Sequence, residues 1–183
     1  ECDTVGRSVK AQMKYADKLG FTEQLSVSGI ATAAGSFDAA PDGSPALAWS
    51  GIGQSTDLVS PIALLRYVCA VANGGTAHEP TVLLGESGGK TRLLSADTAD
   101  ALKSMMHYNV AAVYGTWNFP NLNLCAKSGT AEQGDGTSHA WFTGFLDDEA
   151  HPYAFVVVIE GAGGGLANAG PVANTVLQAA VAK

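Results

Sequence analysis

The most regular hydrophobic pattern in the chain runs from Ile62 to Ala72, which is apolar nearly all round apart from Arg66. A helix that is apolar on every side has to be buried. Ser60 stands before this stretch as an N-cap, and Pro61 takes the first helical position, a combination typical of helix starts. Asn73–Gly75 follows with residues that tolerate a positive φ and end helices. The pattern predicts a buried helix over residues 61–72.

Three apolar segments in the C-terminal third have the length of strands and are separated by short polar turns: Leu122–Lys127, Trp141–Leu146 and Tyr153–Glu160. Short turns join antiparallel neighbours, so these segments predict a three-stranded antiparallel sheet. A smaller hairpin is predicted from Thr81–Leu84 and Thr91–Leu94, because a glycine-containing turn lies between them.

Weaker patterns complete the expected elements. Helices are predicted over 4–19, over 96–107 with Ser95 as the N-cap, and over Pro171–Ala182, whose apolar face would pack on the sheet. Residues 25–50 are rich in Ser, Ala, Gly and Pro and predict an extended loop with at most a short strand. The resulting fold class is α+β, an antiparallel sheet flanked by helices.

Composition narrows the functional classes. The 183 residues suffice for one domain with a core, and 46% of them are hydrophobic while 15% are charged. The net charge of −7 argues against a nucleic-acid partner. No apolar run approaches the ~20 residues of a membrane span, and no signal peptide is visible.

The cysteines and histidines give no sign of a metal or cofactor site. Cys2, Cys69 and Cys125 are scattered, no C-x-x-C occurs, and the four histidines share no ligand spacing. We therefore expect no metal, no cofactor and no disulfide framework. Cys69 lies in the apolar helix and Cys125 in a strand, so both are expected to be small buried hydrophobes.

The chemistry of the chain is concentrated in Lys127-Ser128-Gly129-Thr130, after the apolar run Leu122 to Ala126. The lysine provides a positive charge, the hydroxyls can donate to a carboxylate, and the glycine lets a ligand approach the strand backbone. Such a stretch suits an anion-receiving edge. K-[ST]-G is also a signature of serine acyl-transferases that bind penicillin.

The surroundings of this motif resemble the end of a penicillin-binding protein transpeptidase domain, over roughly Ala16 to Val181. After K-S-G-T-A-E come a polar turn, His139–Phe145 with the pattern H-A-W-F-x-G-F, and an apolar strand that ends in Glu160. Further matches lie upstream in the order of the family: Gly51–Gln54, Ser60–Leu64, Ala72–Gly75, Leu94–Ala96, Met105–Met106 and Gly115–Thr116.

The resemblance implies a β-lactamase/transpeptidase-like sheet, of which this chain holds three strands where the family has five. It implies that Lys127 is catalytic and assists proton transfer. It also implies that Ser128, Gly129, Thr130 and Ala131 bind substrate, with the hydroxyls receiving the terminal carboxylate of a D-Ala-D-Ala stem peptide or a β-lactam and the Ala131 backbone lining the oxyanion pocket. The implied process is peptidoglycan cross-linking at the extracytoplasmic face of the bacterial membrane, in a parent protein that is membrane-anchored. Gln54 resembles a family position near this site, whereas Trp141 is expected in the core or a groove wall and His139 as a hydrogen bonder at a strand start.

The departures from the family concern the nucleophile. The family's S-x-x-K precedes its other motifs, whereas the only match here, Ser87-Gly88-Gly89-Lys90, comes late and has glycines that suit a turn. No S-x-N occurs, and Glu1–Thr4 stands where S-x-N-T would. The chain is therefore expected to be, over residues 1–183, the C-terminal part of one transpeptidase domain without its nucleophile, and to be inactive alone.

Other interpretations remain open. The chain can be a non-catalytic binding module with this fold, or a relative of serine β-lactamases and β-lactam sensors. A nucleotide-binding loop over Leu84–Thr91 is disfavoured, because leucine replaces the first glycine of the phosphate-loop pattern. The strand Tyr153–Glu160 would lack a family neighbour, and an open strand edge invites pairing. We therefore expect a partner segment, a rearranged N-terminus or a swapped dimer at that edge.

Overall fold

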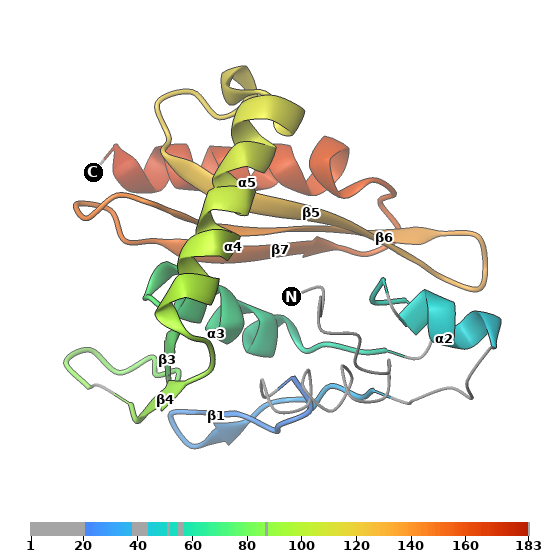
Figure 1. Cartoon of the computed structure of the whole chain (residues 1–183), viewed down its shortest axis with the longest axis horizontal. Helices are drawn as coiled ribbons and strands as arrows, with labels where there is room; N and C mark the ends of the chain where they lie inside the picture. The colour runs from blue at the N-terminus through green and yellow to red at the C-terminus, as the bar shows by residue number, and fades with distance from the viewer. Residues whose placement is uncertain (1–20, 38–43, 51, 55–56, 87, 183) are drawn as a thin grey trace.

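The computed structural model describes residues 21–37, 44–50, 52–54, 57–86 and 88–182. Its centre is an antiparallel sheet in the order β5-β6-β7, formed by β5 (Leu124–Glu132), β6 (Ser138–Leu146) and β7 (Ala154–Ile159) (Figure 1). The three strands confirm the predicted sheet and the α+β class. The predicted helix over 4–19, the segment Glu1–Thr4 and Ser87 lie outside the described residues.

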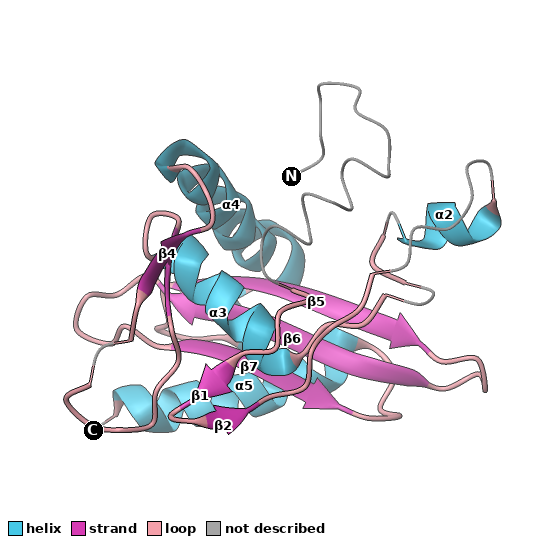
Figure 2. Ribbon diagram, turned by 90° about the horizontal axis from the view of Figure 1, so that it is seen from below, coloured by secondary structure: helices cyan, strands magenta, loops and turns pink. Residues whose placement is uncertain are grey.

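Helices cover both faces of the sheet (Figures 1 and 2). Helix α5 (Gly165–Val181) packs on one face, over a core that includes Phe119, Phe142 and Leu177. Helix α3 (Pro61–Ala72) lies across the opposite face, where Val68 and Val71 pack with Cys125 and Phe145. Helix α4 (Ala96–Tyr108) packs against β5 and α3. Strand β5 is thus packed against α4 on the α3 side of the sheet and against α5 on the other side.

Helix α3 forms as predicted, with Ser60 at the N-cap and Pro61 in the first position. Its single charged residue, Arg66, is buried and bonds the Glu79 carboxylate at 2.8 Å. The helix ends at Ala72, and Gly74 and Gly75 then take φ values of 61° and 93°. A buried charge is tolerated because the carboxylate pairs with it.

Helix α4 begins where Ser95 predicts, since the Ser95 side chain accepts a hydrogen bond from the Thr98 amide. The helix ends at Tyr108, one residue past the predicted end. The π-helix η1 (Asn109–Tyr114) continues directly from it, and the turn η2 (Thr116–Asn118) follows Gly115. This continuation leads the chain directly to the edge of β5.

The predicted hairpin between Thr81–Leu84 and Thr91–Leu94 is wrong. Instead, β4 (Lys90–Arg92) pairs with β3 (Thr76–His78), and 81–84 forms no strand. The glycine turn after α3 sets this register, because the carbonyl of Gly75 accepts from the amides of Leu93 and Leu94.

Two other boundaries differ from the sequence prediction. Residues 25–50 contain the short hairpin of β1 (Ser26–Val27) and β2 (Ile30–Ala31), but also the unpredicted helix α2 (Pro45–Ser50). Helix α5 begins at Gly165 rather than at Pro171, which lies inside the helix. A proline usually marks the first helical turn, and that expectation placed the helix start too late.

At the far side of the sheet, β7 pairs only with β6 within the described part of the chain. A partner at this edge stays a prediction. None of the described helices is long and apolar enough to cross a bilayer.

Candidate active site

The K-S-G-T motif lies in the interior of β5 and not at a strand end, because β5 continues to Glu132. Lys127 stands opposite Thr143 of β6, and Gly129 stands opposite Trp141. The motif is therefore held along its full length by a neighbouring strand on one side. Its other side is an edge of the sheet, where no strand pairs with β5 within the described part of the chain.

The backbone groups of β5 alternate between β6 and that edge. The amide of Ser128 donates to the Tyr114 hydroxyl at 2.8 Å, so it faces the edge. By alternation the amide of Thr130 also faces the edge, whereas Lys127, Gly129 and Ala131 bond to β6. The backbone donor that the edge offers a ligand is thus the Thr130 amide, next to the Ala131 position expected from the sequence.

Side chains occupy most of the neighbouring edge groups. The Gln54 amide donates to the Thr130 carbonyl at 3.0 Å, and Lys127 Nζ donates to the Ser128 carbonyl at 2.5 Å. The Asn109 amide donates to the Ala126 carbonyl at 3.4 Å. Between these contacts, the Thr130 N–H has no partner among the described residues.

The side chains of the motif point to opposite faces of the sheet, since alternate residues of a strand do so. Lys127 lines a cavity of about 500 Å³, together with Gln54, His139 and Trp141. The hydroxyls of Ser128 and Thr130 lie toward α5. The Tyr114 hydroxyl is 3.1 Å from Ser128 Oγ, and the Gly165 amide donates to Thr130 Oγ1 at 3.3 Å. A ligand meets the ammonium and both hydroxyls together only at the strand edge.

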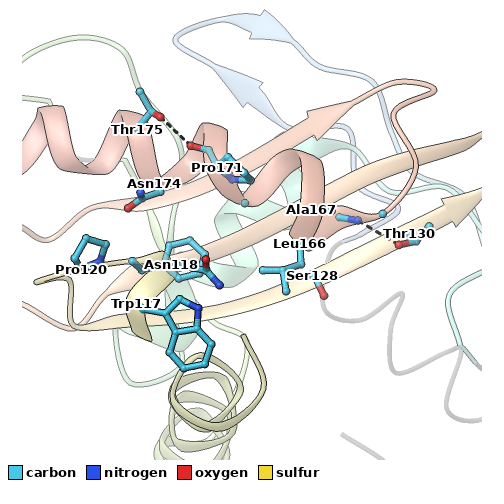
Figure 3. Close-up of a pocket in the computed structure, with 14 residues that line it drawn as sticks. Trp117, Asn118, Pro120, Ser128, Thr130, Leu166, Ala167, Pro171, Asn174 and Thr175 are labelled. Carbon is cyan, nitrogen blue, oxygen red and sulfur yellow. Dashed lines mark hydrogen bonds between the residues drawn. The ribbon is translucent and has the colours of Figure 1, made fainter. Parts of the chain in front are cut away.

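A second cavity, of about 880 Å³, lies on the α5 side of the same edge (Figure 3). It is lined by Trp117 and Pro120 from the segment before β5, by Leu166 and Pro171 of α5, and by Ser128 and Thr130. The edge of β5 thus separates two cavities that share those two hydroxyl residues.

Gly129 and Gly165 each have a packing reason to lack a side chain. A Cβ on Gly129 would meet Trp141 Cβ at 3.3 Å. On the other face, α5 approaches so closely that a Cβ on Gly165 would overlap the backbone of Gly129 and Trp141. Gly129 therefore makes room for Trp141 on one face, and Gly165 lets the start of α5 approach the backbone of β5 on the other.

The structure also places His139 and Trp141, two residues discussed from the sequence, and it adds two site residues that the sequence did not indicate. His139 Nδ1 accepts from the Gly161 amide at 3.1 Å, as expected for a hydrogen bonder at a strand start, and also lines the Lys127 cavity. Trp141 forms part of the wall of that cavity. Sequence reasoning missed Tyr114 and Asn109, which reach β5 from η1. Apart from the Gly115–Thr116 match, no sequence signal marks that segment.

Of the two cysteines that the structure describes, Cys125 is buried and Cys69 is partly buried. Burial, reinforced by the charge of Asp147, raises the pKa of Cys125 to about 11. Burial also raises the pKa of Cys69. Among the residues that the structure describes, no group of three or more His, Cys, Asp and Glu side chains forms a metal site.

Comparison with known proteins identifies matches over most of the chain. The family model described as "Penicillin binding protein transpeptidase domain" matches residues 8–178. The peptidoglycan D,D-transpeptidase PbpA of Mycobacterium tuberculosis is 27% identical in an alignment of 163 residues that covers 77% of this chain and 33% of that protein. The chain thus spans about a third of the length of this relative.

Solved structures agree in fold. Penicillin-binding protein A from M. tuberculosis, in a ceftriaxone acyl-enzyme complex, is 25% identical with a TM-score of 0.78, over 93% of this chain and 43% of that one. A putative peptidoglycan glycosyltransferase from Atopobium parvulum is 20% identical with a TM-score of 0.81, over 96% of this chain and 45% of that one. At that lower identity the likeness concerns the fold alone.

Proposed function

The chain belongs to the penicillin-binding protein transpeptidase domain family, and from that premise we propose that it supplies the substrate-carboxylate-binding strand of a peptidoglycan D,D-transpeptidase. The substrate is a stem peptide ending in D-Ala-D-Ala, and β-lactams bind in its place. The M. tuberculosis relative with a ceftriaxone acyl-enzyme structure supports the β-lactam part of this proposal. The site of action is the extracytoplasmic face of the bacterial membrane.

The observation that carries the proposal is the unpartnered Thr130 amide at the edge of β5, between edge groups that side chains already occupy. A preorganised N–H of this kind stabilises the negative charge that develops on a carbonyl oxygen during acyl transfer. We assign the Thr130 amide this role, which the sequence assigned to Ala131. The C-terminal carboxylate of the substrate then lies beside Ser128, and Lys127 lies on the other face of the sheet at the same edge.

The chemistry proceeds in two steps. A serine oxygen attacks the carbonyl carbon of the penultimate D-Ala, the peptide bond breaks, and the terminal D-Ala leaves as an amine that takes up a proton. An amine of a second stem then attacks the resulting ester, forms the cross-link and gives up one of its own protons to the serine oxygen. Lys127 assists these proton transfers electrostatically, and Thr130 holds the oxyanion in both. The serine belongs to the S-x-x-K segment of the family, for which this chain offers only the match Ser87–Lys90.

Binding of a stem-peptide analogue tests the carboxylate strand without any need for a nucleophile. An acetylated tripeptide ending in D-Ala-D-Ala is titrated into ¹⁵N-labelled chain, in parallel with the same peptide carrying a carboxamide end. We expect amide shifts centred on Ser128 and Thr130 with the carboxylate peptide and several-fold weaker binding of the carboxamide, because a charge-assisted hydrogen bond is lost. Equal binding of the two peptides, or shifts remote from β5, would contradict the proposal.

A non-catalytic binding module remains the second candidate, favoured by the lack of any S-x-N in the sequence. Both functions need the same carboxylate-binding strand. They separate when the segment that holds S-x-x-K in the family is supplied: recovery of acyl-enzyme formation supports the transpeptidase, and binding without acylation supports the module.

A further inference from the structure

Tyr114 makes the closest contact to Ser128 from a side chain outside the motif. Its side chain is buried, with 6% of the residue exposed. Its hydroxyl oxygen accepts from the Ser128 amide at 2.8 Å and lies 3.1 Å from Ser128 Oγ. One phenol hydroxyl therefore contacts both the backbone and the side chain of a proposed substrate-binding residue.

The local structure around Tyr114 fixes this contact. Tyr114 is the last residue of η1, and π-helices are rare and concentrate at functional sites. The first residue of η1, Asn109, contacts the Ala126 carbonyl, so both ends of the π-helix are attached to the edge of β5. The Tyr114 ring packs against Phe142 at 5.8 Å, and its carbonyl accepts from the Asn118 side chain at 2.7 Å.

The two hydrogen bonds allow an arrangement in which the Tyr114 hydroxyl donates to Ser128 Oγ. Because the Tyr114 oxygen accepts from the Ser128 amide, its own hydrogen is available to Ser128 Oγ. Ser128 Oγ then acts as acceptor toward Tyr114, and its own hydrogen is left to donate to a ligand. This arrangement uses every donor once and leaves a hydroxyl donor at the strand edge.

We propose that Tyr114 is a positioning residue that orients the Ser128 hydroxyl toward the substrate carboxylate and sets the position of the substrate along β5. It occupies the Ser128 amide, so an incoming peptide cannot pair there. The next edge amide is that of Thr130, and the carbonyl to be attacked is aligned with it. This inference rests on the proposed function, and it adds a residue that does not touch substrate.

The test compares Tyr114→Phe with a control substitution, Tyr108→Phe. Tyr108 is exposed and is the last residue of α4. The dissociation constant is measured for the acetylated D-Ala-D-Ala tripeptide and for its carboxamide. Tyr114→Phe should weaken the carboxylate peptide about five-fold, the effect of one lost hydrogen bond, and leave the carboxamide unchanged. Tyr108→Phe should change neither value.

Combination with Ser128→Ala separates the possible failures. If Tyr114 acts through Ser128, the effect of Tyr114→Phe disappears in the Ser128→Ala background. Weakening of both peptides alike, or an undiminished effect without Ser128, would overturn the positioning role. If Ser128→Ala itself leaves the preference for the carboxylate intact, the proposed function of the strand fails instead.

A spectroscopic measurement on the unsubstituted protein covers the case in which Tyr114→Phe does not fold. In chain labelled with ¹³C at the tyrosine hydroxyl carbon, addition of the carboxylate peptide should shift the Tyr114 resonance, and Ser128→Ala should abolish that shift. An unchanged Tyr114 resonance on saturation with the carboxylate peptide would contradict the proposal.

Discussion

The backbone amide of Gly165 donates a hydrogen bond of 3.3 Å to the hydroxyl of Thr130. The first residue of α5 is thereby attached to the last residue of the K-S-G-T motif. Gly165 is buried, and a Cβ at this position would overlap the carbonyl oxygens of Gly129 and Trp141. The contact between helix and strand is therefore made by backbone, which leaves little freedom for the motif to move.

Replacing Gly165 by alanine should destabilise the fold. The added methyl group meets backbone atoms that cannot rotate away, and overpacking of this kind costs about 1–3 kcal/mol in the free energy of unfolding. Urea denaturation followed by circular dichroism measures it. Gly164→Ala is the matched control, since its φ is −69° and a Cβ there meets nothing within 4 Å. Equal stabilities of the two variants would show that α5 does not rest on the strand backbone.

Loss of the Gln54 side chain should weaken ligand binding more than it weakens the fold. Gln54 Nε2 donates to the Thr130 carbonyl in an exposed contact, so it holds the 52–54 segment against the edge of β5. We expect Gln54→Ala to raise the dissociation constant of the D-Ala-D-Ala tripeptide about three-fold, with little change in unfolding free energy. The control is Gln133→Ala, whose side chain bonds the Ala131 carbonyl at the far end of the strand. Similar losses in both variants would mean that the Gln54 contact has no special role.

The contrast between these regions explains how far the sequence could predict the molecule. Helix α3 and strands β5–β7 were predictable because their apolar runs match the burial that each position requires. The η1 segment was not predictable, because Asn109 and Tyr114 reach β5 through one widened turn that no period reveals. The 81–84 strand was predicted wrongly because pairing is set by Gly75, which lies outside the two candidate segments.

The same limit applies to the site. The sequence identified Lys127-Ser128-Gly129-Thr130, because these residue types are unusual together at the end of an apolar run. It could not tell which backbone amide remains open. That depends on strand alternation, and the alternation is visible only once Ser128 N–H is seen to bond Tyr114.

The ion pair between Arg66 and Glu79 should stabilise the fold, because the arginine is buried. Arg66 Nη2 lies 2.8 Å from Glu79 Oε1, whereas Glu23 is 3.6 Å from Nη1 and more exposed. Glu79→Gln should lower the free energy of unfolding by about 1–3 kcal/mol, because a buried guanidinium loses its closest charged partner. Glu23→Gln should be nearly neutral in the same denaturation experiment. A larger loss from Glu23→Gln would reverse this assignment.

Stability should fall in alkaline solution because of Cys125. Burial raises the pKa of this thiol from 9.0 to about 11, so between these values the folded state holds a proton that the unfolded state has lost. The free energy of unfolding then decreases as pH rises through that window, by at most about 1.4 kcal/mol per pH unit. The stabilising contribution of the Cys125 thiol is fully present at any pH below the pKa that this thiol has in the unfolded state.

Urea denaturation in reducing buffer, from about pH 8 to about pH 10.5, isolates this effect when wild type is compared with Cys125→Ala. Cys125→Ala loses the packing of the thiol at every pH. Its free energy of unfolding should nevertheless decline less steeply with rising pH, because both proteins share all other groups that titrate in alkaline solution. Parallel declines would show that Cys125 does not titrate differently in the folded state.

The chain alone should form no covalent adduct with a β-lactam. Its only S-x-x-K match ends at Lys90. Lys90 lies in β4, pairs with His78 of β3 and is not part of the sheet that carries Lys127. Gly88 and Gly89 lie in a loop, so the lysine is not presented one helical turn after Ser87, as a helical S-x-x-K requires. Intact-mass measurement after incubation with penicillin should therefore give the unmodified mass, and Ser87→Ala should behave identically. A stoichiometric adduct in the unsubstituted chain would overturn the prediction of an inactive chain, and its loss in Ser87→Ala would identify Ser87 as the nucleophile.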